Sequence, residues 1–247
     1  MTTSIRDLYR YALAEGEGVG TAYEYYAKHR VIAPLMASLP RSPRIVVAGL
    51  PEKYGTSLDF VLLAGQEHAE LLIRDDREAA IEGSQKAVLA VGGAAAMGVA
   101  KLEYRTASLE TLCENTPCDL LLSCEVLQRV PPHAQAAFVR AARASAPRGA
   151  IFVPNSANRS HTGLSGLAGF DAEGLRRLVG TGCDVDFVDM PPFPPGITRS
   201  AEQRQSAKSG AFEAVAMRGL QAYCDAERFV PRMVKERVAH IVFARWR

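Results

Sequence analysis

The sequence predicts an α/β protein with a mostly parallel sheet covered by helices. The main evidence is the stretch 117–161, in which a short apolar run, a loop, an amphipathic helix, a second apolar run and a polar loop follow one another. Such an alternation is typical of parallel strands that are buried beneath helices. A strand, a glycine-containing turn and a helix also follow one another in residues 44–64. Parallel sheets bind ligands beyond the carboxyl ends of their strands, so we expect the functional residues there.

The composition limits the class of protein. A chain of 247 residues is long enough for one α/β domain with a full core. Its 29 basic and 27 acidic residues nearly balance, which argues against a dedicated nucleic-acid or membrane-surface protein. The five cysteines are scattered without a CxxC pair, so they suit a reducing compartment and not a structural zinc site. With neither a signal-peptide pattern nor a membrane-spanning run, we expect a cytoplasmic protein without membrane insertion.

The first forty residues are predicted to be a helical segment that lies on the main domain or over its ligand site. Helices are expected at residues 5–14 and 21–39, because apolar side chains recur there at helical spacing. Tyr23, Tyr25 and Tyr26 could cover a bound cofactor, or they could pack the helix onto the sheet with their hydroxyls at its rim. The general behaviour of aromatic stripes favours packing.

The first two predicted strands end in candidate ligand-binding residues. The strand at 44–48 leads into Gly49 and then into a helix at 57–64, an arrangement that directs backbone amides and a helix N-terminus at a ligand. Neither the dinucleotide GxGxxG pattern nor the Walker pattern is present, which excludes a typical nicotinamide dehydrogenase. The strand at 70–74 ends in Asp75 and Asp76, which could accept the hydroxyls of a ribose or could cap the next helix.

The remaining elements complete a sheet of seven strands. Gly92 and Gly93 are expected to mark a helix end within residues 80–97. Asp171 is a plausible N-cap, and Gly180 lies near the end of the same short helix. The other predictions are strands at 101–105, 118–123, 150–153, 184–189 and 238–246, a helix at 133–145, a proline-rich and then polar loop at 190–210, and a helix at 211–228.

This order of elements carries a family resemblance. The segments CDLLLSCEVLQRVPP and GAIFVPN resemble the motifs after strands four and five of class I S-adenosylmethionine-dependent methyltransferases, in particular those that act on small molecules. The resemblance covers residues 41–247 and implies a Rossmann-like three-layer αβα sandwich. It also implies the strand order 3-2-1-4-5-7-6, with strand seven antiparallel, and an insertion at about residues 191–235. S-adenosylmethionine is the implied cofactor, with S-adenosylhomocysteine as its product.

The resemblance also implies a set of site residues. Ala48, Gly49 and Leu50 would contact the methionine and ribose parts of the cofactor, and Asp75 or Asp76 would bind the ribose hydroxyls. The remaining implied positions are Thr106, Ala107 and Ser108 beside adenine, Cys124 and Glu125 on the floor of the site, and Asn155 and His161 toward the methyl acceptor.

The sequence departs from the family pattern at three places. Only Gly49 remains of the glycine-rich first motif, and Pro51 removes an amide donor from the same turn. Hydroxyl side chains replace the usual acidic residue after strand three. Gln128 and Arg129 replace the usual Glu-His pair after strand four.

Methyl transfer would require few catalytic side chains. The sulfonium methyl is already activated, so such an enzyme chiefly aligns the acceptor, and a base is needed only when the acceptor must lose a proton. His161 is the main candidate base, with Asn155 orienting the acceptor and Glu125 as the alternative base. A surface histidine without a catalytic role is the other interpretation of His161.

Two functions follow from these observations. The first is methyl transfer to a small-molecule acceptor, beneath a lid formed by the N-terminal helices and the insertion. The second is a methyltransferase-fold protein that has lost cofactor binding and serves as a binding or regulatory subunit. The reduced glycine motif favours the second, whereas Asp75, Asp76, Glu125 and Asn155 favour the first, which we prefer. A homodimer and pairing with a related enzyme both remain open.

Overall fold

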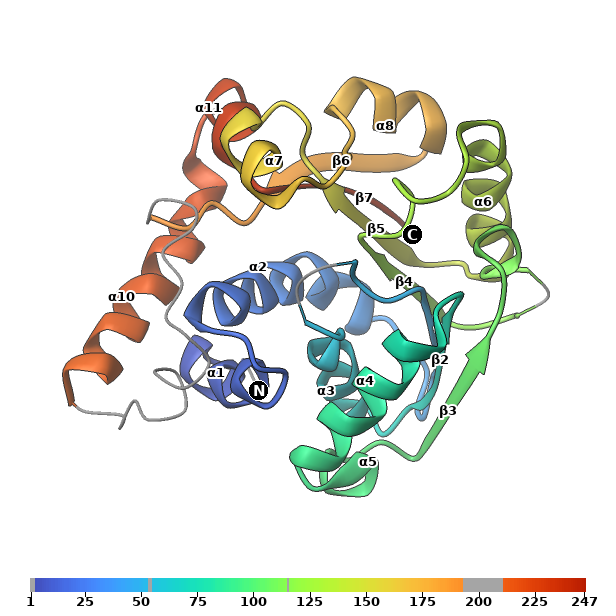
Figure 1. Cartoon of the computed structure of the whole chain (residues 1–247), viewed down its shortest axis with the longest axis horizontal. Helices are drawn as coiled ribbons and strands as arrows, with labels where there is room; N and C mark the ends of the chain where they lie inside the picture. The colour runs from blue at the N-terminus through green and yellow to red at the C-terminus, as the bar shows by residue number, and fades with distance from the viewer. Residues whose placement is uncertain (1–2, 53–54, 115, 193–210) are drawn as a thin grey trace.

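The computed structural model describes residues 3–52, 55–114, 116–192 and 211–247. This part of the chain contains a seven-stranded sheet in the order β3-β2-β1-β4-β5-β7-β6, which confirms the predicted topology (Figure 1). The strands are β1 (Arg44–Ala48), β2 (Glu70–Asp75), β3 (Lys101–Thr106), β4 (Leu120–Cys124), β5 (Gly149–Pro154), β6 (Cys183–Val188) and β7 (Ile241–Trp246).

The pairing of the strands is parallel except at β7. Val47 lies opposite Ile73 of β2 on one side and Leu122 of β4 on the other, in parallel register. β7 is inserted between β5 and β6 and is antiparallel to both. The carboxyl ends of β1, β2, β4 and β5 therefore meet at one edge of the sheet, where the sequence predicted the site.

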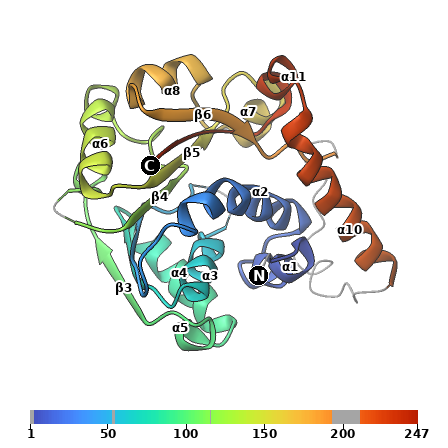
Figure 2. The same ribbon diagram turned by 180° about the vertical axis from the view of Figure 1, so that it is seen from behind.

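Helices cover both faces of the sheet, as the two opposite views show (Figure 1, Figure 2). Alternate residues of each strand enter different cores: Val47 and Leu122 face one helical layer, while Ala48 and Leu121 face the other. The first layer holds α1 (Ile5–Ala14), α2 (Val19–Met36), α3 (Leu58–Gln66), α4 (Glu78–Ala90) and α5 (Gly93–Ala96). The second layer holds α6 (Pro132–Ser145) and α8 (Ala172–Val179).

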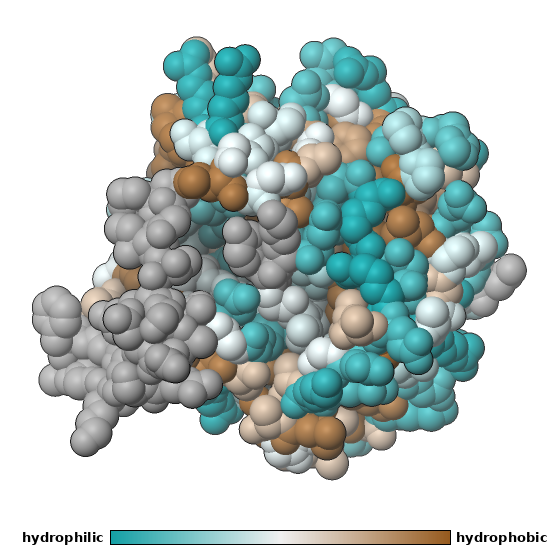
Figure 3. Space-filling model, viewed as in Figure 1, coloured by the Kyte–Doolittle hydropathy of each residue, from teal (hydrophilic) through white to brown (hydrophobic). Residues whose placement is uncertain are grey.

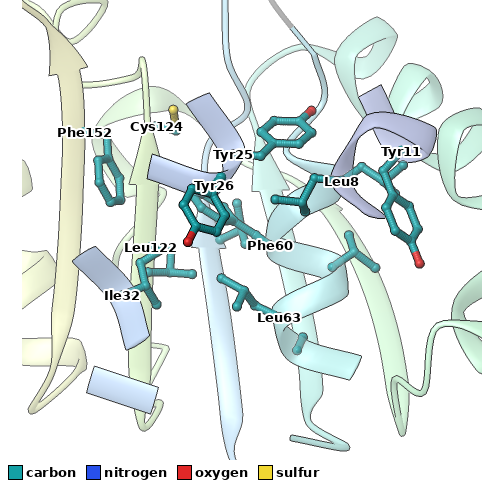
Figure 4. Close-up of a cluster of buried hydrophobic side chains, with 14 of the residues drawn as sticks. Leu8, Tyr11, Tyr25, Tyr26, Ile32, Phe60, Leu63, Leu122, Cys124 and Phe152 are labelled. Atoms are coloured by element: carbon teal, nitrogen blue, oxygen red, sulfur yellow. The ribbon is translucent and has the colours of Figure 1, made fainter. Parts of the chain in front are cut away.

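The N-terminal helices α1 and α2 share the core of the sheet. Figure 4 shows Leu8, Tyr26 and Phe60 gathered between these helices, α3 and the strands. Tyr23, Tyr25 and Tyr26 are all buried, and their hydroxyls reach carboxylates of Glu227, Glu15 and Asp225. The tyrosines thus pack the helix onto the domain, as favoured from the sequence.

The structure corrects several element boundaries. Residues 159–161, the end of the predicted polar loop, belong to the short helix α7 (Arg159–Ser165), because the Asn158 side chain accepts the amide of His161 as an N-cap. The strand predicted from residue 238 begins at Ile241, since α11 (Arg232–Val238) precedes it. The remaining elements are the short η1 (Leu109–Thr111) and η2 (Glu227–Phe229) and the 16-residue helix α10 (Ala211–Ala226).

Two local predictions are confirmed. The Asp171 side chain accepts the amide of Gly174 at the start of α8, and Gly180 ends that helix. The helix after β2 ends before Gly92 and Gly93, which both have positive φ. The proline-rich loop predicted at 190–210 lies outside the described residues from 193 onward.

The coloured part of the face seen in Figure 3 shows no dominant chemical character. On the face seen in Figure 1, hydrophobic residues form small groups among more numerous hydrophilic ones (Figure 3). In the described ranges no helix is long and apolar enough to cross a membrane. The same ranges contain no cluster of three or more residues suited to binding a metal ion.

Candidate functional site

The turn after β1 requires a glycine. Gly49 has a φ of +88°, and its amide donates to the Arg74 carbonyl of β2 at 2.7 Å. A Cβ atom at this position would lie 2.3 Å from a methyl group of Val126, in the loop after β4. Both the backbone conformation and the close approach therefore exclude a side chain. The single glycine that remains of the family motif holds the β1 loop against the β4 loop.

Asp75 is the centre of the polar contacts at this edge. It is the last residue of β2 and is fully buried. Its carboxylate accepts the amide of Leu50 at 2.6 Å, the amide of Arg77 at 2.9 Å and the Arg77 Nε at 2.8 Å. Burial alone would raise the pKa of Asp75, but the hydrogen bonds from Arg77 and Leu50 lower it below its usual value.

Two arginines close over Asp75. Arg129, from the loop between β4 and α6, donates from Nη2 to Asp75 Oδ2 at 3.2 Å and from Nη1 to Asp76 Oδ1 at 2.8 Å. The Nη2 of Arg77 donates to the carbonyls of Leu50 at 2.8 Å and Pro51 at 3.0 Å. We call Asp75, Asp76, Arg77 and Arg129 the arginine cluster. It joins the ends of β1, β2 and β4. The sequence singled out Asp75, Asp76 and the unusual Arg129 but gave no signal for Arg77.

Thr106, the last residue of β3, and the two residues after it lie next to the arginine cluster. The amide of Ala107 donates to the Asp75 carbonyl at 3.0 Å, while Thr106 and Ser108 are exposed. The Ser108 hydroxyl lies 2.9 Å from the hydroxyl of Thr111 in η1. The position predicted to flank adenine is thus close to Asp75 and open to a ligand.

Cys124 and Glu125 face in different directions. The Cys124 thiol is fully buried on the α2 side, with its Sγ 3.7 Å from Nζ of Lys28 (Figure 4). Strand alternation turns the Cys124 side chain into the core, and its place on the floor of the cofactor site stays a prediction. Glu125 has a φ of +54°, which turns the chain after β4, and its Oε2 accepts the amide of Glu52 at 3.3 Å.

The side chain of Asn155 forms hydrogen bonds with backbone groups. Its side chain is fully buried, and its Nδ2 donates to the carbonyls of Glu236 at 2.8 Å and Ala239 at 2.9 Å. Its Oδ1 accepts the amide of Ala157 at 3.1 Å. Asn155 thereby fixes the end of β5 to the segment before β7. The expectation that its amide orients an acceptor stays a prediction.

His161 lies in α7 and stacks on His240. The two imidazole rings are 4.1 Å apart, with an angle of 12° between their planes. Burial, together with the nearby His240, lowers the pKa of His161 to about 4. Its Nδ1 is buried and has no hydrogen-bond partner among the described residues. His161 is therefore a neutral imidazole at physiological pH.

The partner His240 is oriented by a carboxylate. Its Nδ1 lies 3.0 Å from Oδ2 of Asp189, which follows β6 with a φ of +69°. Burial would lower the pKa of His240, but the charge and hydrogen bond of Asp189 raise it above its usual value. An imidazole held by a carboxylate is a typical arrangement for accepting a proton. The sequence offered no signal for this pair, because the two side chains lie 51 positions apart in the chain.

A buried ion cluster fixes α2 beneath the site. Nζ of Lys28 is 2.9 Å from Glu24 and 3.3 Å from Asp59 in α3, and it also faces the rings of Tyr25 and Phe60. Although burial opposes a charge there, the nearby carboxylates raise the pKa of Lys28 well above its usual value. The cluster holds α2 against α3.

Glu15 connects the N-terminal helices to the β1 loop. Its Oε1 accepts the amides of Thr56 at 2.8 Å and Leu58 at 3.0 Å, where α3 begins, and its Oε2 accepts the hydroxyl of Tyr25. Burial raises the pKa of Glu15 to about 7. The carboxyl group thus satisfies backbone amides at a helix N-terminus that has no cap of its own.

Comparison with known proteins identifies the fold. No protein-family model and no curated protein sequence matches this chain. Among solved structures, a candidate sarcosine dimethylglycine methyltransferase from Galdieria sulphuraria aligns with a TM-score of 0.52 and 11% identity over 92% of this chain and 84% of that one. Magnesium protoporphyrin IX methyltransferase from Synechocystis PCC 6803, with bound S-adenosylmethionine, aligns with a TM-score of 0.50 and 14% identity over 93% and 81%.

The chain has the fold of the class I S-adenosylmethionine-dependent methyltransferases. Other similarities are partial: the alignment with TehB from Haemophilus influenzae covers 51% of this chain and 40% of that one, with a TM-score of 0.40 and 10% identity. The shared strand order and the antiparallel β7 agree with the expectation from the motifs after β4 and β5.

Proposed function

We propose that this protein binds S-adenosylmethionine at the carboxyl ends of β1, β2 and β4 and transfers its methyl group to a small molecule. The observation that carries the proposal is the meeting of Gly49, Asp75 and Glu125 at that edge. The Asp75 carboxylate reaches the amide of Leu50, and the Glu125 carboxylate reaches the amide of Glu52. These two acidic side chains therefore border the same β1 turn.

The residues at this edge fit the cofactor. Asp75 is a carboxylate at the tip of β2, as recognition of ribose hydroxyls requires. Gly49 keeps the β1 turn free of a side chain that would meet Val126. Thr106 and Ser108 are exposed beside Asp75, where they would border the adenine. When bound, the cofactor would supply an activated methyl group.

The protein's own residues would position the acceptor and, where needed, hold its proton. His240 has one ring nitrogen fixed by Asp189, which leaves Nε2 as the atom that would take a proton from an acceptor hydroxyl or amine. Its side chain is 17% exposed, so a small acceptor has access to the ring. His161, which stacks on it, would keep the ring in place. Glu125 remains the alternative base, and α1 and α2 remain part of the proposed lid, whereas residues 193–210 of the predicted insertion lie outside the described residues.

A second candidate function has its own support. Arg77 and Arg129 both bind the Asp75 carboxylate, which is the group that a ribose would use. This observation favours a protein that keeps the fold without binding the cofactor and acts as a binding or regulatory subunit.

Calorimetry separates the two functions. We expect saturable binding of S-adenosylmethionine and S-adenosylhomocysteine by the unmodified protein, weakened at least about tenfold in Asp75→Asn, because hydrogen bonds to a charged group contribute about 1.5–3 kcal/mol. Asp119→Asn is a matched control: Asp119 also accepts a backbone amide, from Arg44 at 2.8 Å, but just before β4 at the opposite edge of the sheet. Absence of heat at about 1 mM of either ligand would favour the second function.

A further inference from the structure

Arg129 and Arg77 are held unequally on Asp75. Nε of Arg77 donates to Oδ1 at 2.8 Å, and its Nη2 donates to two backbone carbonyls as well as to Oδ2. Arg129 reaches Oδ2 only through Nη2 at 3.2 Å, and its Nη2 lies 3.5 Å from the carbonyl of Leu50. The Nε of Arg129 is buried and has no hydrogen-bond partner among the residues that the structure describes. Arg77 is therefore the more firmly held of the two cations, whereas Arg129 has a donor without a hydrogen-bond partner among the described residues.

The Oδ2 atom of Asp75 is crowded with donors. It receives the amide of Leu50 at 2.6 Å and the Nη2 atoms of both arginines at 3.2 Å. A carboxylate oxygen has two lone pairs, so a ribose hydroxyl can reach it only when one of these donors leaves. The amide of Leu50 belongs to the fixed β1 turn, and Arg77 is held at several atoms. The donor that can leave is Arg129.

We propose that Arg129 closes the ribose position of the ligand-free protein and moves off Asp75 when the cofactor binds. The inference rests on the proposed function and adds a residue that sets the affinity of the same site. Arg129 would keep a partner as it moves, because its Nη1 is bonded to Asp76, which is 26% exposed. Asp75 would keep Arg77 and the amide of Leu50, so its buried charge would stay compensated.

The proposal predicts opposite effects for the two arginines. If the closed form is populated about nine times in ten, its removal tightens the apparent affinity about tenfold. We therefore expect Arg129→Gln to lower the dissociation constant for S-adenosylhomocysteine about tenfold in calorimetry. Arg77→Gln should raise it, because Arg77 supports the Asp75 carboxylate and the β1 turn. Arg140→Gln, on the exposed face of α6, is the matched control and should leave the dissociation constant unchanged.

Each outcome decides between the hypotheses. Binding by both proteins that is tighter in Arg129→Gln than in the unmodified protein supports the closure by Arg129. Binding in both with equal or weaker affinity in the variant overturns the closure and leaves the proposed function standing. Binding in neither protein overturns both. If Arg129→Gln does not fold, Arg129→Lys, which keeps the charge and loses the planar fork, replaces it and should also bind more tightly.

Discussion

The glycine at the end of β1 provides a quantitative test of the site's geometry. In Gly49→Ala, the added Cβ would lie 2.3 and 2.9 Å from the two methyl groups of Val126, in a backbone with a φ of +88°. The left-handed conformation costs an alanine about 1–2 kcal/mol, and overpacking costs about 1–3 kcal/mol. We expect a loss of about 2–5 kcal/mol in the free energy of unfolding, measured by urea denaturation.

Gly16→Ala is the matched control for this variant. Gly16 also has a positive φ, of +78°, but a Cβ added there would meet no described heavy atom within 4 Å beyond its own chain neighbours. The free energy of unfolding of Gly16→Ala should fall only by the cost of the left-handed conformation, about 1–2 kcal/mol. In the double variant Gly49→Ala, Val126→Ala, the cost of overpacking should disappear once the cost of Val126→Ala measured alone is subtracted. Equal losses at Gly49 and Gly16 would refute the reasoning, because the contact with Val126 would then contribute nothing.

Three further predictions concern buried charges. Burial raises the pKa of Glu15 above its unfolded value, so between about pH 4.5 and 7 the folded state binds a proton that the unfolded state has released. The free energy of unfolding, measured by urea denaturation, should therefore fall by up to about 3 kcal/mol as the pH rises over this range. The Glu15→Gln variant should not show this fall. Asp189→Asn should lower the pKa of His240, measured by NMR titration, since Asp189 is what raises it; an unchanged pKa would remove Asp189 as the cause. Lys28→Met should lower the free energy of unfolding, measured by urea denaturation, by about 3–5 kcal/mol, because Asp59 is left buried without its cation. A decrease of less than about 1 kcal/mol would contradict a stabilising ion pair.

The sequence by itself predicted an α/β sheet and the candidate residues at its edge, and the family resemblance supplied the strand order. Short apolar runs marked the strands, and their alternation with helices indicated a parallel sheet. Gly49 and Asp75 were found because each directly follows or ends a predicted strand. Asp171 and Gly180 were found because helix caps depend on neighbours within a few residues. All of these signals are local in the chain.

Only the tertiary structure decided how the side chains of the site are used. Arg129 meets Asp75 across 54 residues because β4 and β2 both flank β1, and His240 meets Asp189 because β7 lies beside β6. The side-chain amide of Asn155 donates a hydrogen bond to the carbonyl of Ala239, 84 residues away. These contacts depend on which strands are neighbours and on competition for each polar atom. Neither of these is recorded in the spacing of residues, so the sequence predicts a candidate site and only the folded structure shows the partners of its side chains.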